Sequence, residues 1–400
     1  MFFDFSLKSS FLLVFFFHGL VFSVLLFFKG LKMDDKPSFW LSLFTILCTF
    51  YIAPFMLGYA GWYSTNPYRS ILFYVPFQQL LLLPVVLYFY CKTLFDKSFS
   101  FQKRDLLHFL PAILYLVYSL FIFFTDKVIL ERAYFYEDEK DKDFSFWYQI
   151  AGFVSLLFYL IRSLKLYKKY TFFTYNTVSY ADSLTFNWAR RFLISFLLLL
   201  IIRGVFFILN PEWAEFGRKF WYYILFSLLF YYISISGYIN SIRSITSFND
   251  WIFKSKTEDD QRLKPEKVSI KYMEEKESEE KSQILDMDSW KKKIEQLMLN
   301  DKMYENSELS ILDISQRLET HSKKISQIIN KGFNINFNDF VNHYRVNAVI
   351  KKMEEGEHSV QTLLSLAFEC GFNSKSTFNR AFKRNTSLSP NTYIQKKLSK

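Results

Sequence analysis

The sequence predicts an all-α protein in which a seven-helix transmembrane bundle precedes a cytoplasmic all-helical domain with two helix-turn-helix units. Up to about Ile239 the chain is dominated by Phe, Leu, Ile and Tyr, and beyond it Lys, Glu, Asp, Ser and Asn take over. The mean hydropathy of +0.07 is therefore an average over two unlike parts. From Met287 onward apolar residues recur with a helical period, and a pattern of two short helices occurs twice.

Seven apolar stretches predict the membrane part. Most are about 18–21 residues long, which at 1.5 Å per residue crosses a hydrocarbon core of roughly 30 Å. We expect helices because lipid offers no partner to open backbone groups. The first could be a signal peptide, but a retained helix fits better because no small-x-small cleavage site follows it. The stretches are Phe11–Phe28, Phe39–Tyr59, Ile71–Cys91, Leu106–Phe124, Phe146–Ile161, Phe192–Leu209 and Trp221–Ile239.

Loop charges predict the orientation of these helices. Basic residues concentrate on one side, which is typical of the cytoplasmic face. The other side carries an acidic run from Glu137 to Asp143. Seven spans then place the N-terminus outside and the C-terminus in the cytoplasm, in the inner (cytoplasmic) membrane. The basic side holds Lys29, Lys32, Lys36, Lys92, Lys97, Lys103, Arg104, Arg162, Lys165, Lys168, Lys169, Arg190 and Arg191.

Polar residues inside the predicted spans are scattered. Arg203 lies in the sixth span, Gln78 and Gln79 in the third, and His18 in the first. An intramembrane charge suggests a functional site, but Arg203 can also extend its side chain to the outer interface. No ion-coordination or proton-relay pattern stands out.

Two hydrophilic segments connect the predicted parts. Lys165–Arg191 is rich in Tyr, Phe and Thr, and either rests on the inner membrane interface with Trp188 as an anchor or is a disordered loop. Residues 241–285 form a mixed-charge flexible linker with an end-to-end distance of roughly 35–40 Å. The linker therefore separates a membrane region, residues 1–240, from a C-terminal domain, residues 286–400.

The C-terminal domain begins with a helix from Met287 to about Tyr304, whose apolar stripe contains Trp290 and Ile294. Two short helices joined by a tight turn follow, then a longer helix, then a second short pair and a last short helix. Ser310 and Ser359 are the expected N-caps, and Gly371 fits a turn that needs positive φ. In order these helices cover Leu309–Leu318, Ser322–Lys331, Asn336–Met353, Val360–Cys370, Ser374–Lys383 and Pro390–Tyr393.

Charge balance and the spacing of cysteine and histidine residues indicate which partners and cofactors to expect. The 18 Lys and Arg against 13 Asp and Glu between Asp286 and the end give a modest basic surplus that suits nucleic acid. The three cysteines share no CxxC spacing and the five histidines show no ligand spacing. We therefore expect no metal, no cofactor and no catalytic residues.

The stretch LAFECGFNSKSTFNRAFKR, from Leu366 to Arg384, resembles the signature of the AraC/XylS family of transcription regulators. The sequence ISQIIN from Ile325 and NFNDFVNHYRV from Asn336 are similar to the family's first unit and linker helix. The similarity spans about residues 286–397, and the apolar half before it resembles membrane-anchored members with multi-span N-terminal regions.

The resemblance implies two recognition helices that enter successive major grooves of double-stranded DNA, roughly 34–36 Å apart. Gln327 stands where the family often has Arg, which predicts a weaker base contact there. The expected core residues are Ile325, Ile328, Leu366, Ala367, Phe368, Phe378 and Phe382. By position in the motif, the expected base contacts are Lys323, Ser326, Gln327, Lys375, Ser376, Asn379 and Arg380, and the expected phosphate contacts are Lys324, Thr377, Lys383 and Arg384.

These observations favour a membrane-bound one-component transcription regulator whose partners are DNA, the lipid bilayer and an unknown signal at the membrane region. A homodimer is left open. The alternative class is a transporter or sensor with an accessory DNA-binding domain, which would need clustered polar residues in its spans. In a third hypothesis the membrane part is a passive anchor, released by proteolysis in the linker.

Overall fold

The computed structural model describes residues 3–96, 99–136, 145–209, 220–244 and 276–398. Helices are the regular secondary structure of these ranges, which contain one isolated antiparallel bridge, between Val178 and Ser310, and no strand. The chain divides into two compact units. We call residues 1–168 with 186–263 the apolar unit, and residues 169–185 with 264–400 the C-terminal unit.

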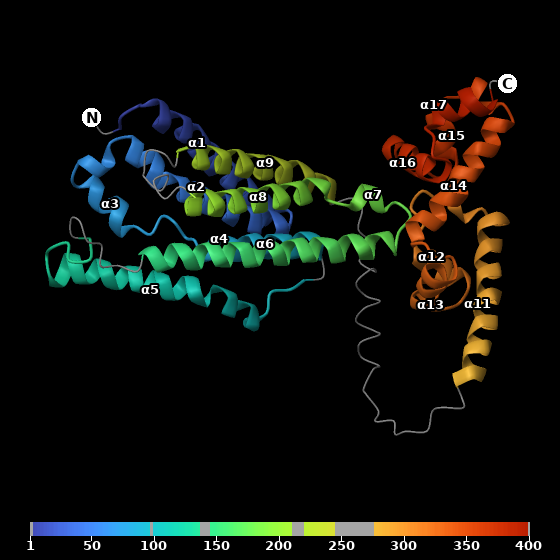
Figure 1. Ribbon diagram of the computed structural model, residues 1–400, viewed down its shortest axis with the longest axis horizontal. Helices are drawn as coiled ribbons and strands as arrows, with labels where there is room; N and C mark the ends of the chain where they lie inside the picture. The colour runs from blue at the N-terminus through green and yellow to red at the C-terminus, as the bar shows by residue number, and fades with distance from the viewer. Residues whose placement is uncertain (1–2, 97–98, 137–144, 210–219, 245–275, 399–400) are drawn as a thin grey trace. The chain divides into compact units, whose positions relative to one another are not determined.

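The apolar unit is built from long helices (Figure 1). Within the described residues, five helical segments are long and apolar enough to cross a membrane: Leu7–Lys32, Lys36–Tyr59, Lys103–Ile129, Phe146–Tyr175 and Phe220–Asn240. The helices are α1 (Leu7–Lys32), α2 (Lys36–Tyr59), α3 (Tyr68–Tyr74), α4 (Leu82–Phe95), α5 (Leu110–Phe124), α6 (Ser145–Tyr175), α8 (Asn187–Leu209) and α9 (Phe220–Ser244).

Close helix packing holds the centre of the apolar unit together. Helix α1 packs along α2, and α9 packs against both. A Cβ at Gly19 of α1 would lie 1.9 Å from Thr49 Oγ1 of α2, so only glycine allows this approach. Leu12 of α1 and Ile52 of α2 are fully buried. Small residues at a helix contact are typical of helices that pack in lipid.

The third predicted span, Ile71–Cys91, is not one continuous helix. Helix α3 ends at Tyr74 and α4 begins at Leu82, so α4 has only 14 residues. Val75, which precedes Pro76, has extended backbone with φ −85° and ψ 118°. The proline ring disfavours helical backbone at the residue before it, and this explains the break. The predicted fifth span continues beyond Ile161 to Tyr175, as part of α6.

Some sequence expectations fall outside the described residues. These are the acidic run 137–143 and most of the predicted linker, residues 245–275. The side chain of Arg203 is also outside them, although its backbone lies in α8. His18 is described, and its Nε2 lies 2.7 Å from Ser234 Oγ of α9.

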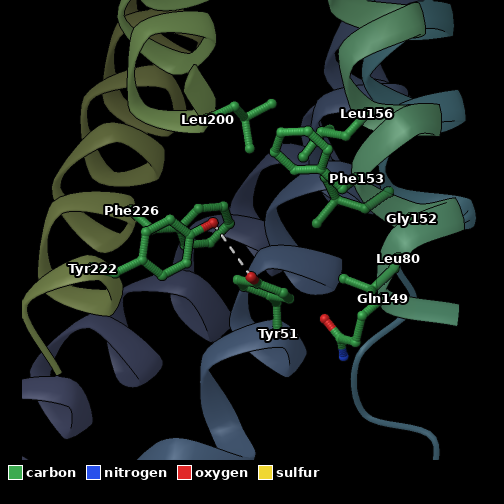
Figure 2. Close-up of a pocket in the computed structure, with 10 residues that line it drawn as sticks. Tyr51, Leu80, Gln149, Gly152, Phe153, Leu156, Leu200, Tyr222 and Phe226 are labelled. Carbon is green, nitrogen blue, oxygen red and sulfur yellow. Dashed lines mark hydrogen bonds between the residues drawn. The ribbon is translucent and has the colours of Figure 1, made fainter. Parts of the chain in front are cut away.

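A small cavity lies among α2, α6, α8 and α9 (Figure 2). Tyr51 and Tyr222 point toward each other there, with their hydroxyl oxygens 3.3 Å apart. Phe153, Leu200 and Phe226 supply much of the apolar lining. Its volume of about 20 Å³ accommodates one water molecule, which needs about 10–15 Å³. In this form the cavity is too small for an organic ligand.

The C-terminal unit contains two pairs of short helices separated by a longer one (Figure 1). Helix α11 starts at Lys276 and ends at Leu299, so it begins earlier and ends earlier than the predicted helix from Met287 to Tyr304. The helices are α11 (Lys276–Leu299), α12 (Ile311–Arg317), α13 (Ser322–Gln327), α14 (Phe337–Glu354), α15 (Leu363–Glu369), α16 (Lys375–Thr386) and α17 (Pro390–Tyr393). A short helix, α7 (Ala181–Leu184), also belongs to this unit.

The structure confirms the predicted N-cap of the first helix pair, α12–α13, but not that of the second, α15–α16. Ser310 caps α12 as predicted, in a reciprocal pair with Asp313. The prediction for Ser359 is wrong, because Thr362 caps α15 and accepts a hydrogen bond from Ser365 N at 3.1 Å. Ser359 instead donates to the Gly356 carbonyl within a short 3-10 turn.

The core of the second helix pair contains Ala367, Phe378 and Phe382, as predicted. Phe368 was expected in this core, but its side chain is 48% exposed. Its position, one residue after Ala367, points it away from the face that α15 buries. Phe372 is buried in its place, at 1% exposure.

Gly371 makes the turn between α15 and α16. Its φ is +88°, as the sequence predicted, which costs glycine little and other residues more. A Cβ there would also lie 2.2 Å from the carbonyl oxygen of Tyr304. The turn therefore packs directly on the backbone that follows α11.

Candidate DNA-binding interface

Helix α16 presents one polar face. Ser374 caps it and accepts a hydrogen bond from Thr377 N at 3.2 Å. The exposed residues follow a helical repeat along one side, while the opposite side packs in the core. The exposed face consists of Lys375, Ser376, Asn379, Arg380 and Lys383.

The chemistry of this face suits base recognition. Asn379 carries an amide that can donate and accept toward adenine, and Lys375 can donate to guanine. Ser376 Oγ lies 3.1 Å from Ser374 Oγ, so its hydroxyl also faces the N-terminal end of α16. These three residues come from the first half of the helix, the part of a recognition helix that usually contacts base edges.

Two arginines of α16 form ion pairs inside the unit. Arg384 Nη1 lies 2.6 Å from Asp339 Oδ1 of α14. Arg380 forms an ion pair with Asp182 of α7. Both arginine side chains stay more than half exposed, at 64% and 55%. Each is therefore held in place by an acidic residue while it still reaches the surface.

Thr377 is the exception among the expected contacts of α16. It is only 3% exposed, and its hydroxyl lies 2.9 Å from Ser374 Oγ. Its side chain supports the helix cap and does not reach the polar face.

Helix α13 presents a smaller polar face. Lys323 and Gln327, one helical turn apart, are exposed. Ser326 is half-buried and accepts a hydrogen bond from Asn330 Nδ2 at 3.2 Å. Lys324 places its ammonium group 4.2 Å from the centre of the Trp290 ring, which joins α13 to α11.

Arg345 of α14 is a buried charged residue that the sequence analysis does not single out. It is 1% exposed and donates to the carbonyls of Tyr304, at 2.8 Å, and of Asn306, at 2.7 Å. Burial lowers the pKa of Arg345 to about 9, which leaves it positively charged at neutral pH. Arg345 also donates from Nη2 to Ser179 Oγ, at 3.0 Å. In the sequence, the sign of this buried charge is an arginine among the apolar positions of the predicted helix Asn336–Met353.

Lys352 connects α14 to the second helix pair. Its ammonium group lies 2.6 Å from Glu369 Oε2 and 3.1 Å from Glu357 Oε2. Hydrogen bonds to Glu369 and then to Glu357 raise the pKa of Lys352 well above its usual range. Because Glu369 is the last residue of α15, this contact helps to hold the second pair against α14.

Residues 314–396 match a family model described as "Helix-turn-helix domain". The matched range runs from within α12 through α17 and so includes α16 with its polar face. Neither the curated proteins nor the solved structures contain a match to this chain. The match identifies residues 314–396 as an AraC-type helix-turn-helix domain, the DNA-binding domain of the AraC/XylS family of transcription regulators.

Proposed function

We propose that this protein is a membrane-bound one-component transcription regulator that binds DNA sequence-specifically through both helix pairs. The polar face of α16, within a matched helix-turn-helix domain, is the observation that carries the proposal. The pair α12–α13 has the same order of elements, a capped first helix, a short turn and a second helix with exposed polar residues.

In this proposal α16 supplies most of the sequence discrimination. Lys375, Ser376, Asn379 and Arg380 contact bases, and Lys383 contacts a phosphate together with Arg384. We leave Thr377 out because its hydroxyl already bonds within the cap.

Helix α13 contributes fewer base contacts. Lys323 and Gln327 reach the surface, and Ser326 lies at its edge. Lys324 is the proposed phosphate contact of this helix, and its ammonium group lies beside the Trp290 ring when DNA is absent. A spacing of about one helical turn between the two recognition helices would put both in major grooves on one face of the duplex.

The apolar unit is proposed to span the inner membrane with the N-terminus outside and the C-terminal unit in the cytoplasm. In the segment Lys103–Ile129, only 11% of the most apolar stretch is buried, and Leu107 and Leu120 are 69% and 67% exposed. So large an apolar surface is unfavourable in water and is expected of a helix that contacts lipid. Reporter fusions after residue 140 and after residue 400 test this topology: an active external reporter at the C-terminus would contradict it.

The DNA-binding proposal is tested with the full chain in lipid nanodiscs and the promoter of its own gene. We expect a specific gel shift whose affinity falls steeply with salt, by about 0.9 log units per phosphate contact for each log unit of salt. An unrelated duplex of equal length is the control. Equal affinity for both duplexes at every salt concentration would refute sequence-specific binding.

A further inference from the structure

The segment Thr177–Leu184, here called the docking segment, joins α6 to α8 in the chain and packs within the C-terminal unit. The sequence predicts that this part of the chain either rests on the membrane interface or is a disordered loop. In the structure Ser179 N donates to the Leu309 carbonyl and Ile311 N donates to the Thr177 carbonyl, both at 2.9 Å. Ile311 is the first residue of α12, so the docking segment satisfies an N–H that the helix itself cannot.

A buried polar site on α14 receives the same segment. Asn338 Nδ2 donates to the Ser179 carbonyl at 2.6 Å, and Arg345 Nη2 donates to Ser179 Oγ at 3.0 Å. Asn338 and Arg345 are 2% and 1% exposed, and Ser179 is fully buried. Buried polar groups are stabilised only when they are paired, so these contacts fix the register of the docking segment on α14.

The docking segment then reaches the polar face of α16. Asp182 forms an ion pair with Arg380 and also accepts a hydrogen bond from the Tyr175 hydroxyl. The Asp182 side chain is only 10% exposed, whereas Arg380 is 55% exposed. The carboxylate thus occupies the guanidinium group through the same charge-assisted contact that a phosphate or a guanine would use.

We propose that the docking segment is a built-in competitor of DNA for the recognition helix α16. This inference rests on the proposed function and adds its regulation. While Asp182 holds Arg380, the guanidinium group is already paired with a carboxylate beside the face that the polyanionic duplex would contact. Release of Asp182 frees the Arg380 guanidinium group for DNA and moves the carboxylate away from the polar face. Because the segment is continuous in the chain with α6 and α8, a signal that moves either helix acts on the contact directly.

The charge on the docking segment is tested with Asp182→Asn in the full chain, in nanodiscs, by fluorescence anisotropy with promoter DNA. We expect at least about fivefold tighter binding to the promoter, because Arg380 becomes available and one negative charge is lost. The matched control is Asp301→Asn, which removes the same charge from the partner of Arg317, 3.3 Å away, and leaves the docking segment intact. We expect less than a twofold change in the control.

A second variant locks the docking segment without touching Asp182. Val178 and Ser310 face each other in an antiparallel bridge of the type without direct hydrogen bonds, where Cα atoms lie about 4.5 Å apart. That separation accepts a disulfide. In Val178→Cys/Ser310→Cys, oxidation should weaken promoter binding at least about fivefold relative to the same protein after reduction.

The outcomes separate this inference from the function on which it rests. Asp182→Asn binding no tighter than the parent chain, together with equal binding by the oxidised and reduced double variant, refutes the competition. If the parent chain shows no preference for promoter DNA, the proposed function fails and the competition fails with it. Tighter binding by Asp301→Asn to the same extent would show a general charge effect and also overturn the inference.

Discussion

The turn at Gly371 provides a sharp test of the structure, because the chain contains a matched glycine. Gly371 has φ +88° and Gly356 has φ +84°. A Cβ at Gly356 meets nothing within 4 Å, whereas a Cβ at Gly371 would lie 2.2 Å from the Tyr304 carbonyl oxygen and 2.8 Å from that of Glu305. The two Gly→Ala variants therefore share the backbone strain and differ in the clash.

The expected cost follows from these contacts. Left-handed backbone costs an alanine about 1–2 kcal/mol, and this is all that Gly356→Ala should lose. In Gly371→Ala the backbone of residues 304–305 must also move. The Tyr304 carbonyl accepts the Arg345 hydrogen bond at 2.8 Å, and a hydrogen bond to a charged group contributes about 1.5–3 kcal/mol. We expect a total loss of about 3–5 kcal/mol.

Urea unfolding of the fragment 276–400 measures both losses through Trp290, the only tryptophan in that range. The midpoint of Gly371→Ala should fall well below that of Gly356→Ala, with similar slopes for the two transitions. Equal losses in the two variants would refute the close contact between the Gly371 turn and the backbone after α11.

Three further predictions concern the same domain. Phe372→Ala should cost about 3–5 kcal/mol of unfolding free energy, whereas Phe368→Ala should cost less than about 1 kcal/mol; equal losses in urea unfolding would contradict the assignment of Phe372 to the core. Burial raises the pKa of the Cys370 thiol to about 11, so its thiolate fraction at pH 8 is low. Labelling of Cys370 by a disulfide reagent should therefore be at least about a hundredfold slower in the native fragment than in urea. The native labelling rate should rise as the pH approaches 11. Rapid native labelling at pH 8 would contradict this. Asn379→Ala should lower the preference for the promoter by about 1–3 kcal/mol at one adenine. Lys383→Ala should instead weaken binding to all duplexes alike and reduce the salt slope by about 0.9. Gel shifts in a salt series distinguish the two variants, and a uniform loss of affinity in Asn379→Ala would argue against a base contact.

The sequence predicted those features of the C-terminal domain that depend on neighbouring residues. Apolar spacing predicted the short helices, Ser310 was recognisable as a cap from the residue type and its position, and Gly371 from the turn it makes. The polar face of α16 also follows from spacing, because residues four apart share a side of a helix. All of these depend on interactions within a few residues along the chain.

Some local features were visible in the sequence and yet mispredicted. Pro76 interrupts the third apolar stretch through its effect on Val75, although the stretch has the composition of one span. Phe368 and Phe372 are both apolar and lie four residues apart, but the left-handed turn at Gly371 lies between them. Their burial is decided by the direction in which that turn sends the chain, which composition does not report.

Only the tertiary structure revealed the docking segment and its contacts with Arg345 and Arg380. Ser179 and Arg345 are 166 residues apart, and no periodicity or motif relates them. A polar loop next to apolar helices has the same composition whether it contacts lipid, water or protein. The tertiary structure decides among these because the buried guanidinium of Arg345 needs acceptors, and the backbone of residues 304–306 together with Ser179 provides them.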